Sequence, residues 1–334
     1  MKMIDDSLLD HKVMVTNLQP GTSYCYRVGY EGHWSDIRYF RTADEQQGEY
    51  SFVYMTDSHI INPEYVSAAE LCATALAKNE KDIRFCLFPG DFVDTGGAAN
   101  SEWEWERWFE YSMQPILAKM PVAPTDGNHD DSSNRNYNLH FNTNNDFNMV
   151  SKVKPQFQGI TYSFVYGDVL FLVYSKQDYW RGTYNYKNQT SDYLSRDVAN
   201  WFREQVALYP NTKWRVALVH YNIFSGSGHQ TDEMTPMFRA TMLPVMKECE
   251  IDVVLQGHDH CYEVIGPVDP DTRTPILSAI KDVEDVPVNM ITNMSGKKGG
   301  TFCTDDGTLY FIGATCGRKR YEPYSRLTME SNYS

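Results

Sequence analysis

The chain carries comparatively few basic residues and no closely spaced pairs of cysteines. Its 30 Lys and Arg stand against 44 Asp and Glu, which gives a formal net charge of -14. Non-specific nucleic-acid binding depends on a basic surface, so we expect no nucleic-acid partner. The seven cysteines form no CxxC pair, which disfavours a thiolate zinc site such as a zinc finger.

Long apolar runs, internal repeats and low-complexity tracts are lacking as well. No apolar run reaches the roughly 20 residues that a membrane-spanning helix needs, so we expect no membrane span. The first residues do not have the charged and apolar pattern of a signal peptide. With 334 residues, 42% of them hydrophobic, the chain can form one large core and a small second domain.

Five short clusters of acidic, amide and imidazole residues are the most informative feature that the sequence does contain. Four of them follow predicted strands at residues 50–55, 83–88, 214–219 and 252–255, which are rich in β-branched and aromatic residues. The carboxyl ends of strands in an open α/β sheet line one crevice, so we expect one shared site. The clusters are Asp57-Ser58-His59, Gly90-Asp91-Phe92-Val93-Asp94, Gly127-Asn128-His129-Asp130, His220 and Gly257-His258-Asp259-His260.

The side chains in these clusters are of the types that bind metal ions. Carboxylate, imidazole and amide oxygen suit borderline or hard divalent and trivalent ions. The candidate ligands are too many for one tetrahedral ion, which indicates two ions. A two-metal centre can bind a phosphate oxygen and lower the pKa of a bridging water, which is the chemistry of phosphoester hydrolysis. The candidates are His59, His220, His258, His260, Asp57, Asp91 and Asn128.

The ordered set D-x-H, GDxxD, GNHD, H and GHxH resembles the calcineurin-like metallophosphoesterase superfamily over residues 50–320. The resemblance implies an α/β fold, a sandwich of mixed sheets flanked by helices. It further implies two ions, for which iron, manganese and zinc all suit the ligands. Its implied ligands are Asp57, His59 and His260 for the first ion, Asn128, His220 and His258 for the second, and Asp91 as the bridge.

The resemblance leaves His129 free of metal and implies that it donates a proton to the leaving oxygen or stabilises the phosphoryl charge. The stretch from Gly90 to Gly96 is similar to the GDxVDxG motif of Ser/Thr phosphoprotein phosphatases, which implies that Asp94 orients His129. Asp94 could instead cap the turn before Gly96. Those phosphatases have an arginine where this chain has Thr95, which argues against protein phosphatase activity. We expect Asp130 and Asp259 to support neighbouring ligands or to contact solvent.

The N-terminal stretch resembles the fibronectin III-like domain that precedes the catalytic domain in many purple acid phosphatases. Residues 15–24, 26–29 and 40–42 supply about three strand-like runs, whereas a complete sandwich of this type has roughly seven strands. We therefore expect residues 1–45 to form a partial fibronectin III-like β-domain and residues 46–334 to form the catalytic domain. Purple acid phosphatases carry a tyrosine where this chain has Asp94, so a colourless or weakly coloured relative is implied. The resemblance to secreted phosphatases favours an extracytoplasmic location.

The remaining pattern predicts helices over residues 63–79, 101–119, 195–208 and 235–249, and a β-hairpin over 161–174.

Two interpretations stay open for some polar residues. His220, taken alone, is typical of a satisfied core histidine. The glycine-rich loop 225–229 could bring His229 or a serine hydroxyl to a phosphate. Trp103, Trp105 and Trp108 alternate with glutamates, which favours an amphipathic helix face over a substrate wall.

These observations favour a hydrolase that cleaves phosphomonoesters through a metal-bound hydroxide, with a small phosphorylated molecule as substrate. A phosphodiesterase or nucleotidase with the same site is the nearest alternative. A binding module with a vestigial metal site is a further alternative, which the complete ligand set disfavours. The sequence carries no signal for an oligomeric state.

Overall fold

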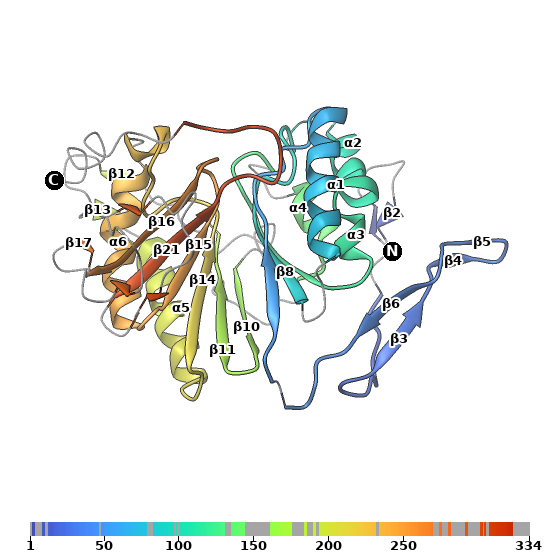
Figure 1. Ribbon diagram of the computed structural model, residues 1–334, viewed down its shortest axis with the longest axis horizontal. Coiled ribbons are helices and arrows are strands. Elements are labelled where there is room, and N and C mark those ends of the chain that lie inside the picture. Colours follow the sequence, from blue (N-terminus) through green and yellow to red (C-terminus); the bar gives the residue numbers. More distant parts are fainter. Residues whose placement is uncertain are drawn as a thin grey trace.

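The computed structural model describes residues 13–46, 48–78, 83–96, 98, 101–130, 135–143, 161–175, 194–231, 234–269, 304 and 307–322, together with eight isolated two-residue strands. In this part of the chain two β-sheets pack against each other and helices cover their outer faces (Figure 1). The expected fold class, a sandwich of mixed sheets flanked by helices, is confirmed. No helix among the described residues has the length and apolar character needed to cross a membrane.

The larger sheet has a parallel centre with antiparallel edges. Its parallel strands are β11 (Val169–Val173), β14 (Trp214–Val219), β15 (Val253–Gln256) and β21 (Thr308–Gly313). At one edge β10 (Tyr162–Tyr166) forms the predicted hairpin with β11. At the other edge β16 (Tyr262–Asp269) runs antiparallel to β21 and pairs with β17 (Thr274–Pro275) and β19 (Ile291–Thr292).

The smaller sheet consists of three parallel strands, β7 (Ser51–Tyr54), β8 (Ile83–Pro89) and β9 (Val122–Thr125). One hydrophobic cluster joins it to the larger sheet, because Phe85 and Leu87 of β8 pack with Phe171, Val216 and Leu218. Parallel strands buried on both faces read as continuous apolar runs, which is why the sequence revealed them.

Helices complete two further layers. On the side of the smaller sheet lie α1 (Pro63–Ala77), α2 (Glu102–Arg107), the π-helical turn η1 (Trp108–Ser112), α3 (Gln114–Leu117) and α4 (Arg135–His140), and on the other side lie α5 (Leu194–Leu208) and α6 (Met234–Glu248) (Figure 1). Helix α1 begins where Asn62 accepts hydrogen bonds from the backbone N–H groups of Glu64 and Tyr65, with Pro63 in the first turn.

The prediction of one helix over residues 101–119 is wrong. The chain there forms α2, then the π-helical turn, and α3 begins afresh at Gln114. Pro115 explains the break, because proline lacks the N–H that a helix interior needs and is tolerated only in a first turn. The other three helices, the four strands before the ligand clusters and the two strands of the hairpin agree with the predicted ranges to within two residues, whereas the N-terminal strand-like run over residues 15–24 is a strand only from Ser23.

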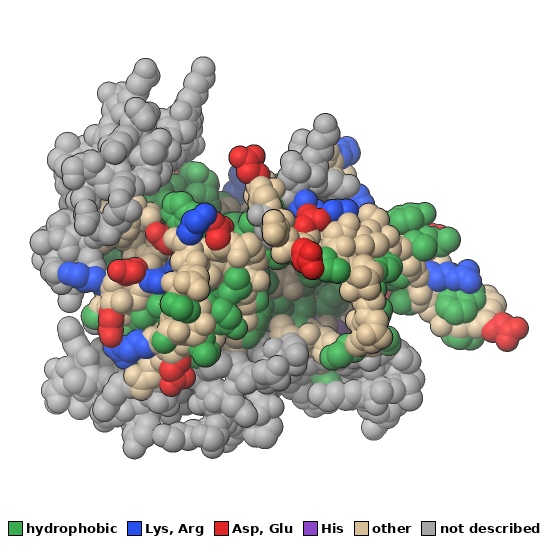
Figure 2. Space-filling model, turned by 90° about the horizontal axis from the view of Figure 1, so that it is seen from below, with side chains coloured by type: hydrophobic (Ala, Val, Ile, Leu, Met, Phe, Trp, Pro, Cys, Tyr) green, Lys and Arg blue, Asp and Glu red, His purple; other side chains and the backbone are tan. Residues whose placement is uncertain are grey.

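The N-terminal part is rich in short strands. Strand β3 (Ser23–Tyr26) pairs with β6 (Arg38–Arg41), and β4 (Gly29–Tyr30) pairs with β5 (His33–Trp34). The Tyr26 hydroxyl donates to the carbonyl oxygen of Ala118 at 3.1 Å, which joins this part to the α3 side of the body. In Figure 2 this part projects from the body and shows apolar side chains on its surface. Tyr30 and Trp34 are among its exposed residues. The remaining short strands are β1 (Lys2–Met3), β2 (Leu9–Asp10), β12 (Tyr184–Asn185), β13 (Thr190–Ser191), β18 (Ile280–Lys281) and β20 (Thr301–Phe302).

Candidate metal centre

The predicted ligands lie in the loops that follow the carboxyl ends of β7, β8, β9, β14 and β15. Four of them have left-handed backbone, with φ of 57° at Asp57, 45° at His59, 52° at Asp91 and 69° at His258. This conformation costs a non-glycine residue about 1–3 kcal/mol and is concentrated at functional sites. The fold therefore holds these side chains in place against local backbone preference.

The first group of candidate ligands is Asp57, His59, Asp91 and His260. Each offers one ligand atom, and these atoms all lie within 4.8 Å of one another. The Nε2 atoms of His59 and His260 are 3.0 Å apart, and Nε2 of His260 is 3.2 Å from Oδ1 of Asp57. All four residues are buried. The geometry is that of side chains converging on one point.

The second group shares Asp91 with the first and adds His220 and His258. Nε2 of His220 lies 3.2 Å from Oδ2 of Asp91 and 3.0 Å from Oδ1 of Asn128. The structure thus brings all seven predicted ligands into one place, arranged as two groups around a common carboxylate.

Oδ2 of Asp91 tests whether two ions fit this site. It is buried and has no hydrogen-bond partner, although Nε2 of His59 lies at 3.3 Å and Nε2 of His220 at 3.2 Å on either side. A buried carboxylate oxygen without a partner is costly, whereas one bound between two cations is satisfied. The donor set therefore fits a pair of ions with Asp91 as the shared ligand.

The histidine tautomers fit as well. Nδ1 of His220 faces the Pro89 carbonyl oxygen at 2.7 Å, and Nδ1 of His260 faces the Lys319 carbonyl oxygen at 3.0 Å. Nδ1 of His59 faces Oδ1 of Asp94 at 2.9 Å. Each oxygen can only accept, so each Nδ1 carries the hydrogen and the Nε2 lone pair points toward the centre. Metal-binding histidines are oriented in this way by an oxygen on their far side.

The carboxylates hold protons on two of the histidines when no cation is bound. Burial opposes a charge on His59, but the neighbouring carboxylates of Asp57 and Asp91 overcome it and raise its pKa to about 12. Burial likewise opposes a charge on His220, and Asp91 raises its pKa to about 9. Burial holds the pKa of His258 well below its usual value, with further lowering by His220. Cations bound here would take the place of protons.

Asp130 joins the two loops that carry Asp91 and Asn128. Its carboxylate accepts hydrogen bonds from the backbone N–H groups of Asp91 at 2.8 Å, Phe92 at 2.7 Å and Gly127 at 2.7 Å. These contacts agree with the expectation that Asp130 supports neighbouring ligands. Asp259 also turns away from the centre, because the hydroxyls of Ser225 and Ser227 donate to its two oxygens.

Asp94 contacts both His59 and its predicted partner His129. Its carboxylate binds His59, and its Oδ1 is 3.6 Å from Nδ1 of His129. The His129 Nδ1 instead donates to the backbone carbonyl oxygen of Asp94 at 2.7 Å. Glu104 explains the arrangement, because its carboxylate accepts from the N–H groups of Asp94 and Thr95 at 3.0 and 2.8 Å and fixes the turn. Asp94 thus contacts both histidines, one through its side chain and one through its backbone.

Sequence reasoning missed several residues that position the site. Glu104 was expected on the polar face of an amphipathic helix, yet only 1% of it is exposed. The segment 314–322 after β21 was not considered, because it has no acidic or imidazole cluster. Its Tyr321 ring stacks on His260 with a centroid distance of 4.4 Å, and Thr315 donates to the Asp57 carbonyl oxygen. The one signal in the sequence that could have found the segment 314–322 was its position after the carboxyl end of the central strand β21.

The loop 225–229 approaches the second group. The His229 ring stacks on the His258 ring with centroids 3.8 Å apart, and it lies in the 3₁₀ turn η4 (Gly228–Thr231). Gly257 permits the close packing of this region, because a Cβ there would lie 2.5 Å from Oγ1 of Thr56 and 2.8 Å from Nδ1 of His220. Gly257, which precedes the HDH motif, is therefore required because a larger residue would collide with its neighbours.

Comparison with known families agrees with this site. The model of the calcineurin-like phosphoesterase family matches residues 50–262, and the model of the purple acid phosphatase N-terminal domain matches residues 2–42. The fold and the two ligand groups define a metallophosphoesterase-type protein, and the chain belongs to the calcineurin-like phosphoesterase family. Among its members, the chain resembles purple acid phosphatases.

Individual relatives are distant. Purple acid phosphatase 18 of Arabidopsis thaliana is 27% identical over 269 residues, which cover 76% of this chain and 52% of that protein. An uncharacterised protein of Mycobacterium tuberculosis is 24% identical over 286 residues, 78% of this chain and 52% of its own. The chain therefore spans about half the length of these relatives. A purple acid phosphatase from yellow lupin (Lupinus luteus) seeds shares the fold, with a TM-score of 0.58, 16% identity, and coverage of 93% of this chain and 53% of that one.

Proposed function

We propose that the chain is a dinuclear metal-dependent hydrolase of phosphomonoesters, with iron, manganese or zinc as its ions. The observation that carries the proposal is the buried Oδ2 of Asp91, which has no hydrogen-bond partner and lies between Nε2 of His59 and Nε2 of His220. Asp57, His59 and His260 would hold one ion, and Asn128, His220 and His258 the other. Family membership supports the reaction class.

Ions bound there would supply Lewis-acid chemistry, in that they polarise the phosphoryl group and activate a water for direct attack without a covalent phosphoenzyme. The protein supplies position and proton transfer. Asp91 receives a hydrogen bond from the His129 backbone N–H at 2.9 Å through its other oxygen, which ties the bridging carboxylate to the GNHD loop. The His129 ring is fixed by the Asp94 carbonyl oxygen, and 30% of its side chain is exposed. A proton on its Nε2 would therefore be available to the leaving oxygen.

The partial β-domain over residues 1–45 and the extracytoplasmic location belong to the same proposal. The match of the N-terminal family model to residues 2–42 supports the first. The resemblance to purple acid phosphatases supports the second. A small phosphorylated substrate follows from the reaction class.

Two aryl substrates test the proposal. The protein, loaded in turn with iron, manganese and zinc, should hydrolyse an aryl phosphomonoester faster than the corresponding bis-aryl diester. The reverse order would favour the phosphodiesterase alternative, and no turnover with any ion would favour a binding module.

The variant Asp91→Asn tests the bridge. We expect it to lose bound metal and turnover together, because an amide is a weaker and neutral ligand for two cations. Asp168→Asn, in the exposed turn between β10 and β11, is the matched control and should retain both. Full metal content with full turnover in Asp91→Asn would show that the bridging role is wrong.

A further inference from the structure

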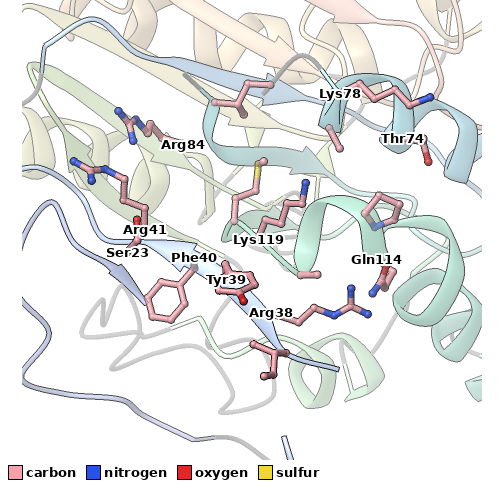
Figure 3. A pocket seen from close by; sticks show the side chains of 16 residues that line it. Ser23, Arg38, Tyr39, Phe40, Arg41, Thr74, Lys78, Arg84, Gln114 and Lys119 are labelled. Atoms are coloured by element: carbon pink, nitrogen blue, oxygen red, sulfur yellow. The ribbon is translucent and has the colours of Figure 1, made fainter. Parts of the chain in front are cut away.

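A cleft of about 900 Å³ separates the N-terminal strands from the body of the protein. One wall is β6, and the other is formed by the end of α1, the start of β8 and the α3 region (Figure 3). Ile83 and Arg84 at the beginning of β8 line it, whereas the candidate metal centre lies beyond the other end of that strand. Seven strand residues span roughly 20 Å, so the cleft is a separate place.

The lining of this cleft is basic, in contrast to the whole chain. None of its 16 lining residues is Asp or Glu, although acidic residues outnumber basic ones by 44 to 30 in the sequence. The cleft would therefore attract anions, while most of the surface repels them. The five basic residues are Arg38, Arg41, Lys78, Arg84 and Lys119.

Neighbouring acids offset this charge in part. Asp44, outside the lining, forms an ion pair with Arg41 and lies 3.6 Å from Arg84. Asp36 lies 3.8 Å from Arg38, and its side chain is 88% exposed. Ion pairs between partly exposed side chains are weak and are easily exchanged for a better partner. Among the described residues, the five basic side chains that line the cleft outnumber these two neighbouring acids.

One buried donor in the wall has no hydrogen-bond partner. Nε of Arg84 is buried and makes no hydrogen bond within the described structure, although the side chain as a whole is 23% exposed. A buried guanidinium N–H without an acceptor is unfavourable, and an anionic oxygen that displaced the atoms covering this wall of the cleft would satisfy it. This observation is independent of the count of charges.

The basic groups are spread along the cleft. Arg41 and Arg84 lie together at one end, Lys119 lies between the walls, and Arg38 points toward Gln114 at the other end (Figure 3). A single phosphate would reach only one of these places. An elongated anion with several charged groups would reach more of them. Tyr39 and Ile37, 64% and 56% exposed, offer apolar surface for an organic group attached to such an anion.

We propose that this cleft binds a small oligophosphate, at a site distinct from the metal centre. Arg84 and Arg41 contact one end of the phosphate chain, Lys119 contacts its middle, and Arg38 with Gln114 contacts the other end. The ligand thereby bridges the N-terminal strands and the catalytic body.

Isothermal titration calorimetry of the metal-free protein tests this site, because phosphates would otherwise bind at the metal centre. The metals are removed with a chelator, which is itself removed by gel filtration. Inorganic triphosphate is titrated first and a nucleoside triphosphate second, each at low salt and at high salt. We expect one site per chain and weaker binding at high salt. Tighter binding of the nucleotide would identify an attached organic group as part of the ligand, and equal binding would identify the phosphate chain alone.

Lys119→Gln removes one charge at an exposed position, where folding should be unaffected. It should weaken binding roughly three- to tenfold, the effect of one unit charge at about 5 Å in a solvent-like dielectric. Arg203→Gln is the matched control, since Arg203 pairs with Glu248 on the α5 and α6 side of the molecule. Thermal unfolding confirms that each variant is folded. Absence of binding at millimolar triphosphate overturns the proposal, as does equal weakening by the control.

Discussion

Replacement of Asp94 by alanine distinguishes two roles for this residue. The sequence motif implied that its carboxylate orients His129, whereas the structure places that carboxylate 2.9 Å from Nδ1 of His59. Hydrogen bonding to His59 also holds the pKa of Asp94 below its usual value, which favours the ionised carboxylate. The substitution should therefore act on metal binding first.

The expected magnitude follows from the contact that is lost. Without the carboxylate, Nδ1 of His59 loses its partner, and Nε2 becomes a less basic and less well oriented ligand. Loss of such a partner typically costs 10- to 100-fold in metal affinity, or about 1.4–2.7 kcal/mol. His129 keeps its hydrogen bond, because it is bound by the backbone carbonyl oxygen of residue 94, which alanine retains.

The assay is turnover measured as a function of free metal concentration, set with a competing chelator. We expect Asp94→Ala to need 10- to 100-fold more metal and then to approach the wild-type rate within a few-fold. Asp94→Asn is the matched control, because its amide oxygen still accepts a hydrogen bond from His59 but carries no charge. The metal concentration that this variant needs should lie between those of the wild type and Asp94→Ala. A loss of roughly 10² to 10⁴ in turnover at every metal concentration, with unchanged metal affinity, would refute this reasoning and favour the general-acid pairing with His129.

Three further predictions concern neighbouring residues. His129→Ala should keep both metals while turnover falls by roughly 10² to 10⁴, the usual size of a general-acid contribution, and loss of metal by elemental analysis would make it a ligand. Asp130→Asn should destabilise the metal-free protein by about 1–3 kcal/mol in urea unfolding, because the new NH₂ group faces backbone N–H donors in a fully buried site; an effect below about 0.5 kcal/mol would contradict this. Metal affinity should rise with pH by roughly tenfold per pH unit for each proton that the metal displaces. For the proton on His220 this rise should end above the pKa of that residue, about 9. If chelator competition gives the same metal affinity from pH 6 to 8, no proton is displaced.

The strands and the positions of the ligands were largely predictable. Buried parallel strands are continuous apolar runs, so residues 83–88 and 214–219 could be recognised without any tertiary information, and the structure has β8 and β14 there. The acidic and imidazole clusters follow those runs directly. Because the carboxyl ends of parallel strands meet at one edge, the sequence order also predicted that Asp57, Asp91 and His258 would share a site.

Helix boundaries were less certain where local signals competed. The stretch 101–119 has helical periodicity, but Pro115 divides it, and the polar face assigned to Glu104 is buried. A carboxylate that accepts backbone N–H groups from a distant loop leaves no periodic trace in the sequence. Residue type alone therefore gave the wrong environment for Glu104.

The sequence by itself determined which side chains could bind metal and that they would gather at the ends of strands, since both follow from residue type and local periodicity. Only the tertiary structure decided which atoms face each other. The carboxylate of Asp94 is hydrogen-bonded to His59 and also lies 3.6 Å from His129, Tyr321 stacks on His260, and basic residues from β6, the C-cap of α1 and β8 meet in one cleft. Such contacts depend on loop conformation and on the packing of segments that are far apart in the chain, and hydrogen-bond direction is fixed only when both partners have their final positions.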